Sequence, residues 1–260
     1  MASSCCPAKR LCLRSEKVGV INKKYYLNAI REDPNDILSY FELERIYSES
    51  GQLDAAKKIL ITLVKQKPDA VAYNNLAIIL SKLGKIKQSL RMCKKAIALE
   101  PNYKSPYIQA GSNYLSLHHY AKAIVFFKKA LRANSANLIP IQKELVFVNM
   151  GFAYDKMGIT KKALDAYRSA LKINPRYSLA HTNISAIYLD LRKFSSAIKH
   201  ARLSLRANRN DTRARHNLAL AYLYSGKRSY FFRLYRVLQR VDHEMAKKCL
   251  KKLTVFESKK

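Results

Sequence analysis

Residues 144–175 read ELVFVNMGFAYDKMGITKKALDAYRSALKINP, and residues 176–209 read RYSLAHTNISAIYLDLRKFSSAIKHARLSLRANR. Shifted by 34 positions, the second half repeats the size pattern of the first half. The matching pairs are Phe147 and His181, Met150 and Ile184, Gly151 and Ser185, Tyr154 and Tyr188, Ala163 and Ala197, Tyr167 and Ala201, Ala170 and Ser204, and Pro175 and Arg209. Large residues fall on large and small on small at most pairs, so the chain contains an internal repeat.

The spacing within each half predicts two packed helices. Residues 147, 150, 151 and 154 share one helical face, and residues 163, 167 and 170 form the facing stripe of a second helix. We expect the two backbones to approach closely where Gly151 faces Ala163, because a bulky side chain would hold them apart. Gly158 is expected to end the first helix in a left-handed cap, and Pro175 to stop the second.

A 34-residue unit of this kind resembles the tetratricopeptide repeat. The resemblance covers roughly residues 22–228 and implies an all-α fold, namely a right-handed α-α solenoid of about five to six helix pairs with a C-terminal capping helix. Units are expected to start near Ile37, Ala70, Lys104, Glu144, Ser178 and Thr212. The turn between the two helices of a unit is marked by Gly51, Gly84, Gly158 and Gly226.

Four segments follow from this register. We expect a disordered basic tail over residues 1–20, an N-terminal half-repeat helix over 21–36, the repeat array over 37–228, and a basic capping helix with a tail over 229–260. In the last segment Phe231 stands where a small residue is needed, and a basic amphipathic helix for a membrane or a calmodulin-like partner remains the alternative. The insertion 138–143 is expected to lengthen the first helix of the fourth unit, with a lip on the binding face as its alternative.

The net charge of +31 is unevenly distributed. Residues 1–69 hold 12 Lys and Arg against 9 Asp and Glu, and residues 70–260 hold 37 against 9. Such a field favours nucleic acid, anionic lipid or an acidic protein, although a lysine-rich solvated surface explains it as well. The resemblance places the second helices on the convex face, where a basic surface is expected from Lys94, Lys95, Lys128, Lys129, Lys161, Lys162, Lys199, Arg202 and Arg206.

Catalytic patterns are missing from the sequence. The six histidines show no metal-ligand spacing and the glycines are used by turns, so we expect no enzyme, no metal site and no cofactor. Five cysteines do not form a disulfide framework, which favours a reducing cell interior, the cytoplasm in preference to mitochondria. The sequence contains no run of eighteen apolar residues, so we expect no membrane-spanning helix.

One set of residues exceeds what packing requires. An amide side chain stands at the same position in five successive first helices. We call these residues the amide ladder: Asn75, Gln109, Asn149, Asn183 and Asn217. Asparagine is a poor helix former, so its repetition needs a reason. The set is similar to the asparagine-ladder arrays of O-GlcNAc transferase-type superhelices, which implies that these amides grip a peptide backbone. Solvated polar residues are the alternative.

Positions next to the amide ladder would form the floor of the same groove. They are Asn74, Ile78, Ile108, Val148 and Phe152, followed by Ser112, Leu145, Thr182, Ala186 and Leu189. This largely apolar floor predicts a non-catalytic adaptor or scaffold, a monomer that binds a peptide segment of a partner protein in its concave groove. The competing hypothesis is a basic solenoid that binds nucleic acid or another polyanionic surface through its convex face.

Overall fold

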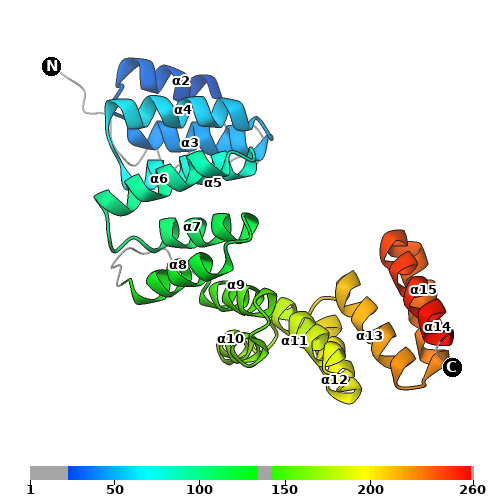
Figure 1. Ribbon diagram of the computed structural model, residues 1–260. Coiled ribbons are helices and arrows are strands. Elements are labelled where there is room, and N and C mark those ends of the chain that lie inside the picture. Colours follow the sequence, from blue (N-terminus) through cyan, green and yellow to red (C-terminus); the bar gives the residue numbers. More distant parts are fainter. Residues whose placement is uncertain (1–22, 134–141, 259–260) are drawn as a thin grey trace. The chain divides into compact units, whose positions relative to one another are not determined.

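The computed structural model describes residues 23–133 and 142–258, which form fourteen helices and no strand. The predicted all-α fold is confirmed for these residues. The chain divides into two compact units, residues 1–101 and residues 102–260, and each is described by itself. Figure 1 shows the helices following one another as pairs within each unit.

Unit 1 contains five described helices that surround one apolar core. They are α2 (Lys23–Glu32), α3 (Ile37–Glu49), α4 (Leu53–Gln66), α5 (Ala70–Lys82) and α6 (Ile86–Leu99). Tyr40, Leu43 and Leu60 are buried in this core. The start of α3 is capped by Asp36 and that of α5 by Asp69, because each carboxylate accepts a hydrogen bond from an amide in the first turn.

Unit 2 contains nine described helices. They are α7 (Lys104–Ser116), α8 (Tyr120–Arg132), α9 (Lys143–Lys156), α10 (Thr160–Ile173), α11 (Ser178–Asp190), α12 (Phe194–Ala207), α13 (Thr212–Tyr224), α14 (Arg228–Val241) and α15 (His243–Glu257). Each helix packs on the next, and three apolar clusters follow one another along the unit, two of which share Phe147 and Tyr154. Neighbouring helix pairs therefore cover each other's apolar faces.

A residue with positive φ ends the first helix of each pair. Gly51, Gly84, Gly158 and Gly226 have φ between 73° and 79°. His118 and Arg192 occupy the same turn with φ of 58° and 57°. Glycine adopts this conformation without steric cost, whereas an L side chain costs roughly 1–2 kcal/mol there. The turn is thus required by the fold even where the sequence supplies no glycine.

The glycines inside helices make room for aromatic rings. A Cβ atom on Gly151 would lie 2.6 Å from Cε1 of Tyr167, and one on Gly111 would lie 2.5 Å from Cε1 of Phe127. Both rings are at most 1% exposed. The predicted close approach opposite Ala163 stays a prediction, and the atoms nearest to Gly151 belong to the Tyr167 ring, one turn further along α10.

The C-terminal segment differs from the prediction of one capping helix. Asp242 interrupts it with φ of −158° and accepts a hydrogen bond from the Met245 amide, which starts α15. The segment upstream, α14, completes the sixth helix pair against α13. Phe231 does not prevent this pairing: its ring is fully buried and stacks on Tyr235 with an interplanar angle of 11°. The capping role passes to α15, which packs on both α13 and α14.

The insertion 138–143 lies largely outside the described residues. Of its described residues, Lys143 is the first residue of α9 and Gln142 is the N-cap, so the lengthening of the helix stays a prediction for the rest of the insertion. Four residues of the insertion, 138–141, and the predicted tail over 1–20 belong to the parts that are not described.

Candidate peptide-binding surface

The first helices of unit 2 form a continuous row. Consecutive members of the series α7, α9, α11, α13 and α15 contact each other directly, and we call this series the first-helix row. Each of the first four carries one amide-ladder residue. The residue two places after the ladder position is here called the contact position. Contact positions hold Glu44, Ala77, Gly111, Gly151 and Ser185.

Asn217 is buried and is used by the fold. It is 9% exposed, and its Nδ2 donates to the Thr182 carbonyl at 3.1 Å and to Oγ of Ser185 at 2.9 Å. Ser185 is the contact position of α11. Asn217 therefore joins α13 to α11, and its predicted role in peptide binding is corrected to a packing role.

The N-terminal ladder residues also have partners. In unit 1, Nδ2 of Asn75 donates to Glu44, the contact position of α3, at 3.4 Å. In unit 2, Nε2 of Gln109 donates to Oδ1 of Asn113 on its own helix at 3.1 Å. Both amides are half-buried, so part of each remains accessible.

Asn183 is satisfied by a residue from a second helix. The contact position of α9 is Gly151, which has no side chain, and the Tyr167 ring lies over it. The Asn183 side chain lies near enough to the Tyr167 hydroxyl to lower its pKa as a hydrogen-bond donor. Burial raises the pKa of this phenol, and the bond to Asn183 partly offsets the shift. The aromatic ring thus supplies the polar atom that Gly151 lacks.

Asn149 has no such neighbour. The contact position of α7 is Gly111, and the ring over it is Phe127, which carries no hydroxyl. The Asn149 amide is half-buried and makes no hydrogen bond with any described residue. An amide offers one acceptor and two donors. Toward the described residues, the Asn149 side chain therefore uses none of its hydrogen-bonding capacity.

Three predicted floor residues are not available. Asn74 is 3% exposed and Val148 is 2% exposed, because both side chains point between packed helices. Thr182 is also buried, with its hydroxyl bonded to Asp211 and Ser204. The prediction that these positions line a groove was wrong. The remaining floor positions are half-buried: Ile78, Ile108, Ser112, Leu145, Ala186 and Leu189.

Phe152 is the exposed apolar member of the set. It stands one helical turn after Asn149 on α9, is 37% exposed, and lies under the Lys156 ammonium at 5.4 Å from the ring centroid. Large exposed aromatic rings next to unpaired polar groups are common at binding surfaces. An amide, a ring and an ammonium thus occupy one side of α9.

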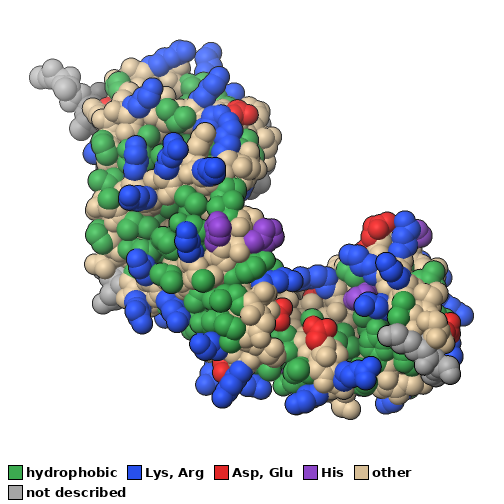
Figure 2. Space-filling model, in the orientation of Figure 1, with side chains coloured by type: hydrophobic (Ala, Val, Ile, Leu, Met, Phe, Trp, Pro, Cys, Tyr) green, Lys and Arg blue, Asp and Glu red, His purple; other side chains and the backbone are tan. Residues whose placement is uncertain are grey.

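Two carboxylates lie beside this strip. Burial raises the pKa of Asp155 on α9, and the nearby Asp190 of α11 raises it further, while Lys156 lowers it. Neither carboxylate forms an ion pair with a described residue. In Figure 2, acidic side chains appear over α9 and α11 in a molecule that is otherwise rich in Lys and Arg.

Comparisons with known proteins agree with this architecture. A tetratricopeptide-repeat family model matches residues 70–103 and 145–177, and a second model of the same repeat matches residues 105–137. The chain contains tetratricopeptide repeats.

Relatives of these repeats occur in larger proteins. Superkiller protein 3 of Schizosaccharomyces pombe is 25% identical over 215 residues, which is 77% of this chain and 15% of that protein. The chain therefore spans a small part of that relative's length.

Solved tetratricopeptide structures share the fold. PilW, a type IV pilus biogenesis factor, gives a TM-score of 0.73 at 15% identity, covering 84% of this chain and 99% of PilW. YrrB, described as a TPR protein with an unusual peptide-binding site, gives 0.55 at 22% identity, covering 74% and 97%. At these identities the likeness shows the fold alone.

The predicted basic residues lie on the second helices of the tetratricopeptide pairs, and all are exposed: Lys94, Lys95, Lys128, Lys129, Lys161, Lys162, Lys199, Arg202 and Arg206. Two of these side chains also contact aromatic residues of the fold. Arg202 donates to the Tyr222 hydroxyl at 2.6 Å, and Lys95 lies over the Tyr73 ring at 5.2 Å. Arg202, Leu205, Arg206 and Arg209 line a surface depression of about 410 Å³ on α12.

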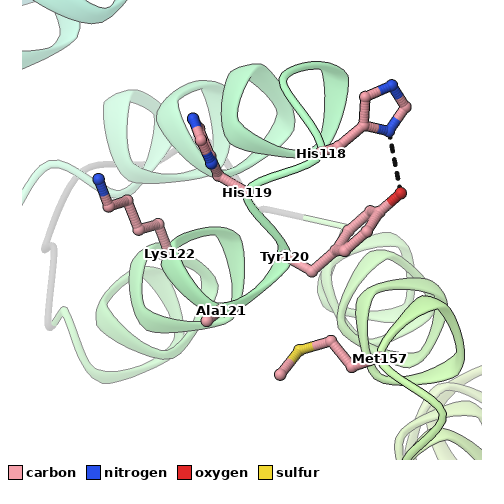
Figure 3. A pocket seen from close by; sticks show the side chains of 6 residues that line it. All are labelled: His118, His119, Tyr120, Ala121, Lys122 and Met157. Carbon is pink, nitrogen blue, oxygen red and sulfur yellow. Dashed lines mark hydrogen bonds between the residues drawn. The ribbon is translucent and has the colours of Figure 1, made fainter.

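A second depression, of about 340 Å³, lies at the α7–α8 turn of the third tetratricopeptide pair (Figure 3). His118 Nδ1 is 2.9 Å from the Tyr120 hydroxyl, and Met157 lies across from the turn. Within residues 23–133 and 142–258, no three metal-ligating residues gather at one place. In the same residues, no helix has the length and apolar character needed to cross a membrane.

Proposed function

We propose that this protein is a non-catalytic adaptor that binds a peptide segment of a partner protein along the first-helix row of unit 2. The single observation that carries the proposal is the pairing on α9 of an amide without a partner among the described residues, Asn149, with an exposed ring, Phe152. The amide suits a peptide main chain, and the ring suits an apolar side chain. The likeness in fold to YrrB, which has a peptide-binding site, supports the same kind of ligand.

The proposed site is narrower than the amide ladder. Asn149 and Phe152 are its centre, Asn183 and Gln109 lie on the helices at either side, and Ile108 contributes a half-buried apolar wall. Asn75 and Ile78 of unit 1 are kept as separate candidates. We leave out Asn217, Asn74 and Val148 because they are buried. On cysteine usage, we place this activity in the cytoplasm.

The test begins with peptide ligands selected on the immobilised full chain from a random peptide library. Their affinity is then measured by calorimetry for the wild type and for Asn149→Ala combined with Phe152→Ala. Loss of a hydrogen bond and an apolar contact should weaken binding by roughly ten- to a hundredfold. The fold should survive, because both side chains are at least partly exposed and alanine is the better helix former.

The matched control is Lys161→Glu with Lys162→Glu on α10. Both lysines are exposed and belong to the same helix pair as Asn149. Peptide affinity should stay close to that of the wild type apart from long-range field effects. If this control loses binding and the α9 variant does not, the proposed site is wrong.

The alternative function is polyanion binding through the second helices. It is favoured by one observation: α8, α10, α12 and α14 carry 15 Lys and Arg and one acidic residue. Binding through phosphates should have weak sequence preference and fall steeply with salt. A single-stranded oligonucleotide whose affinity is unchanged between low and high salt would rule out that mechanism.

A further inference from the structure

The formal charge along the first-helix row of unit 2 runs from +1 on α7 through −1 on α9 and α11 together to +4 on α13 and α15 together. Helices α9 and α11 carry two lysines and three acidic residues, whereas α13 and α15 carry six Lys and Arg and two glutamates. The second helices show no such change, since they are basic throughout. The asymmetry therefore belongs to the row that the proposed function uses.

The basic end centres on one side of α15. Four lysines, which we call the α15 lysine patch, lie within a 140° arc of an ideal helix: Lys247, Lys248, Lys251 and Lys252. All four are exposed. Lys247 pairs with Glu244 at 3.0 Å, and the other three form no ion pair with a described residue. Their positive charge is therefore largely uncompensated.

The α15 lysine patch borders α13. His216 on α13 has a pKa lowered by burial, and Lys248 and Lys252 lower it further, so both ammonium groups lie near its ring. Nε2 of His216 is buried and has no hydrogen-bond partner among the described residues. Asp242 also lies near Lys248, but its carboxylate caps α15 by accepting from the Met245 amide. Figure 2 shows Lys and Arg side chains gathered at this end of unit 2.

The other end of the polarised row is Asp155 with Asp190. Lys156 on the same helix lowers the pKa of Asp155 and Asp190 raises it, and neither carboxylate forms an ion pair with a described residue. A cation from a ligand would add to the effect of Lys156. The same two carboxylates would repel a strand of phosphates that followed the row.

Resting on the proposed function, we propose that the partner segment is a peptide of opposite charge at its two ends. Acidic side chains bind the α15 lysine patch, and a basic side chain binds between Asp155 and Asp190. A nucleic acid carries one negative charge per nucleotide along its whole length and cannot match this row. A peptide can, because its charge varies from residue to residue.

The geometry also sets the spacing. Two helix-to-helix steps separate α11 from α15, or roughly 20 Å at about 8–10 Å per step. An extended peptide advances about 3.3 Å per residue. The basic and acidic blocks of the partner should therefore be about six residues apart.

The experiment uses fluorescence anisotropy with the full chain and labelled synthetic peptides. The probe peptide has a lysine block and a glutamate block joined by about six neutral residues that include leucine. Comparison peptides have the same composition with alternating charges, or the glutamate block alone. A uridine oligonucleotide serves as the polyanion. We expect the probe peptide to bind more tightly than all three comparison ligands.

The decisive variant is Lys248→Glu with Lys252→Glu, and the matched control is Arg236→Glu with Arg240→Glu on α14. Both pairs are exposed, spaced four residues apart and free of ion pairs with described residues. The α15 variant should lose affinity for the probe peptide roughly tenfold or more, and the α14 control about twofold. Lys248→Gln with Lys252→Gln gives the same test with less disturbance of folding.

Two results would overturn the proposal. One is an equal loss in the α15 and α14 variants, which would reduce the effect to net charge. The other is tighter binding of the oligonucleotide than of the probe peptide through α15. Failure of this inference is distinguishable from failure of the proposed function. If Asn149→Ala with Phe152→Ala abolishes binding and the α15 variant does not, the site stands and its charge preference is wrong.

Discussion

The junction between α7 and α9 and the junction between α9 and α11 are built alike but treat their amides differently. In both, a glycine on the earlier first helix leaves space for a ring from a second helix. At the later junction the ring is Tyr167, whose hydroxyl binds Asn183. At the earlier one it is Phe127, and Asn149 finds no partner among the described residues. The two junctions therefore differ by one phenolic oxygen, which lies near Asn183 and has no counterpart on Phe127.

The largest expected effect comes from removing what the two junctions share. Gly111→Val and Gly151→Val each place side-chain atoms where the Phe127 and Tyr167 rings now lie. Since both rings are buried and cannot swing away, each change should lower the free energy of unfolding by about 3 kcal/mol. Urea unfolding followed by circular dichroism measures this. Adding Phe127→Leu to Gly111→Val should restore part of the loss. A loss below about 1 kcal/mol would mean that the rings relax freely.

A smaller effect on stability should distinguish the buried amide of Asn217 from the half-buried amide of Asn149. Asn217→Ala removes two hydrogen bonds from a site that is 9% exposed, and should cost about 1–2 kcal/mol of unfolding free energy. Asn149→Ala removes none to a described residue, and should change stability by less than about 0.5 kcal/mol. The same unfolding experiment compares the two. Equal losses would contradict the assignment of different roles.

Exchanging the rings should exchange the roles. Tyr167→Phe takes the hydroxyl from Asn183 and should cost about 1 kcal/mol, and Phe127→Tyr offers a hydroxyl to Asn149. If Asn149 anchors the peptide, Phe127→Tyr should weaken peptide binding about fivefold, because a ligand must then compete with the new bond. Tyr167→Phe should leave affinity unchanged or improve it. Calorimetry with a selected peptide decides, and a stronger complex with Phe127→Tyr would contradict the model.

The smallest expected effect concerns a titratable contact in the next helix pair. Nδ1 of His181 and Nδ1 of His200 are 3.0 Å apart, and Nε2 of His181 is 3.0 Å from the Pro175 carbonyl. Burial lowers the pKa of both imidazoles, that of His200 to about 4. His181, Lys199 and Arg168 lower the pKa of His200 further, whereas the Pro175 carbonyl raises that of His181.

The sign of the resulting pH dependence follows from linkage. Both folded-state pKa values lie below the unfolded value of about 6.5, so protonation favours the unfolded chain. The contribution to stability is complete above about pH 6.5 and is lost as the pH falls towards 4. Thermal unfolding across this range should show a smaller decline for His200→Gln, which keeps a donor and does not titrate. Parallel declines in both proteins would exclude the histidine pair as the cause.

The sequence predicted the elements of the fold better than the availability of its side chains. Helical spacing, the turn glycines and the exposed second-helix lysines depend on neighbours within one helix pair. A local sequence pattern can therefore predict them. The state of Asn149 depends on Phe127, a residue of the preceding pair. The sequence does show Phe127 at the position where the next pair has Tyr167. Only the packing shows that the Phe127 ring lies over Gly111.

The burial of Val148 and Asn74 was missed for a related reason. A helix that packs on three neighbours has a narrow exposed strip, and positions one place away from that strip are enclosed. The break before α15 could have been predicted, since Asp242 precedes a helical pattern as an N-cap residue. The unbroken apolar stripe across it suggested one helix instead.

The two described cysteines can report local opening, one in each unit. Cys93 in unit 1 and Cys249 in unit 2 are at most 1% exposed, and burial raises the pKa of each thiol to about 12. The thiolate is the species that attacks an alkylating reagent, so neither residue should react until its surroundings open. Replacing Cys5, Cys6 and Cys12 by serine leaves one reactive site in each unit. The labelling rate at each remaining cysteine then measures how often that unit unfolds locally.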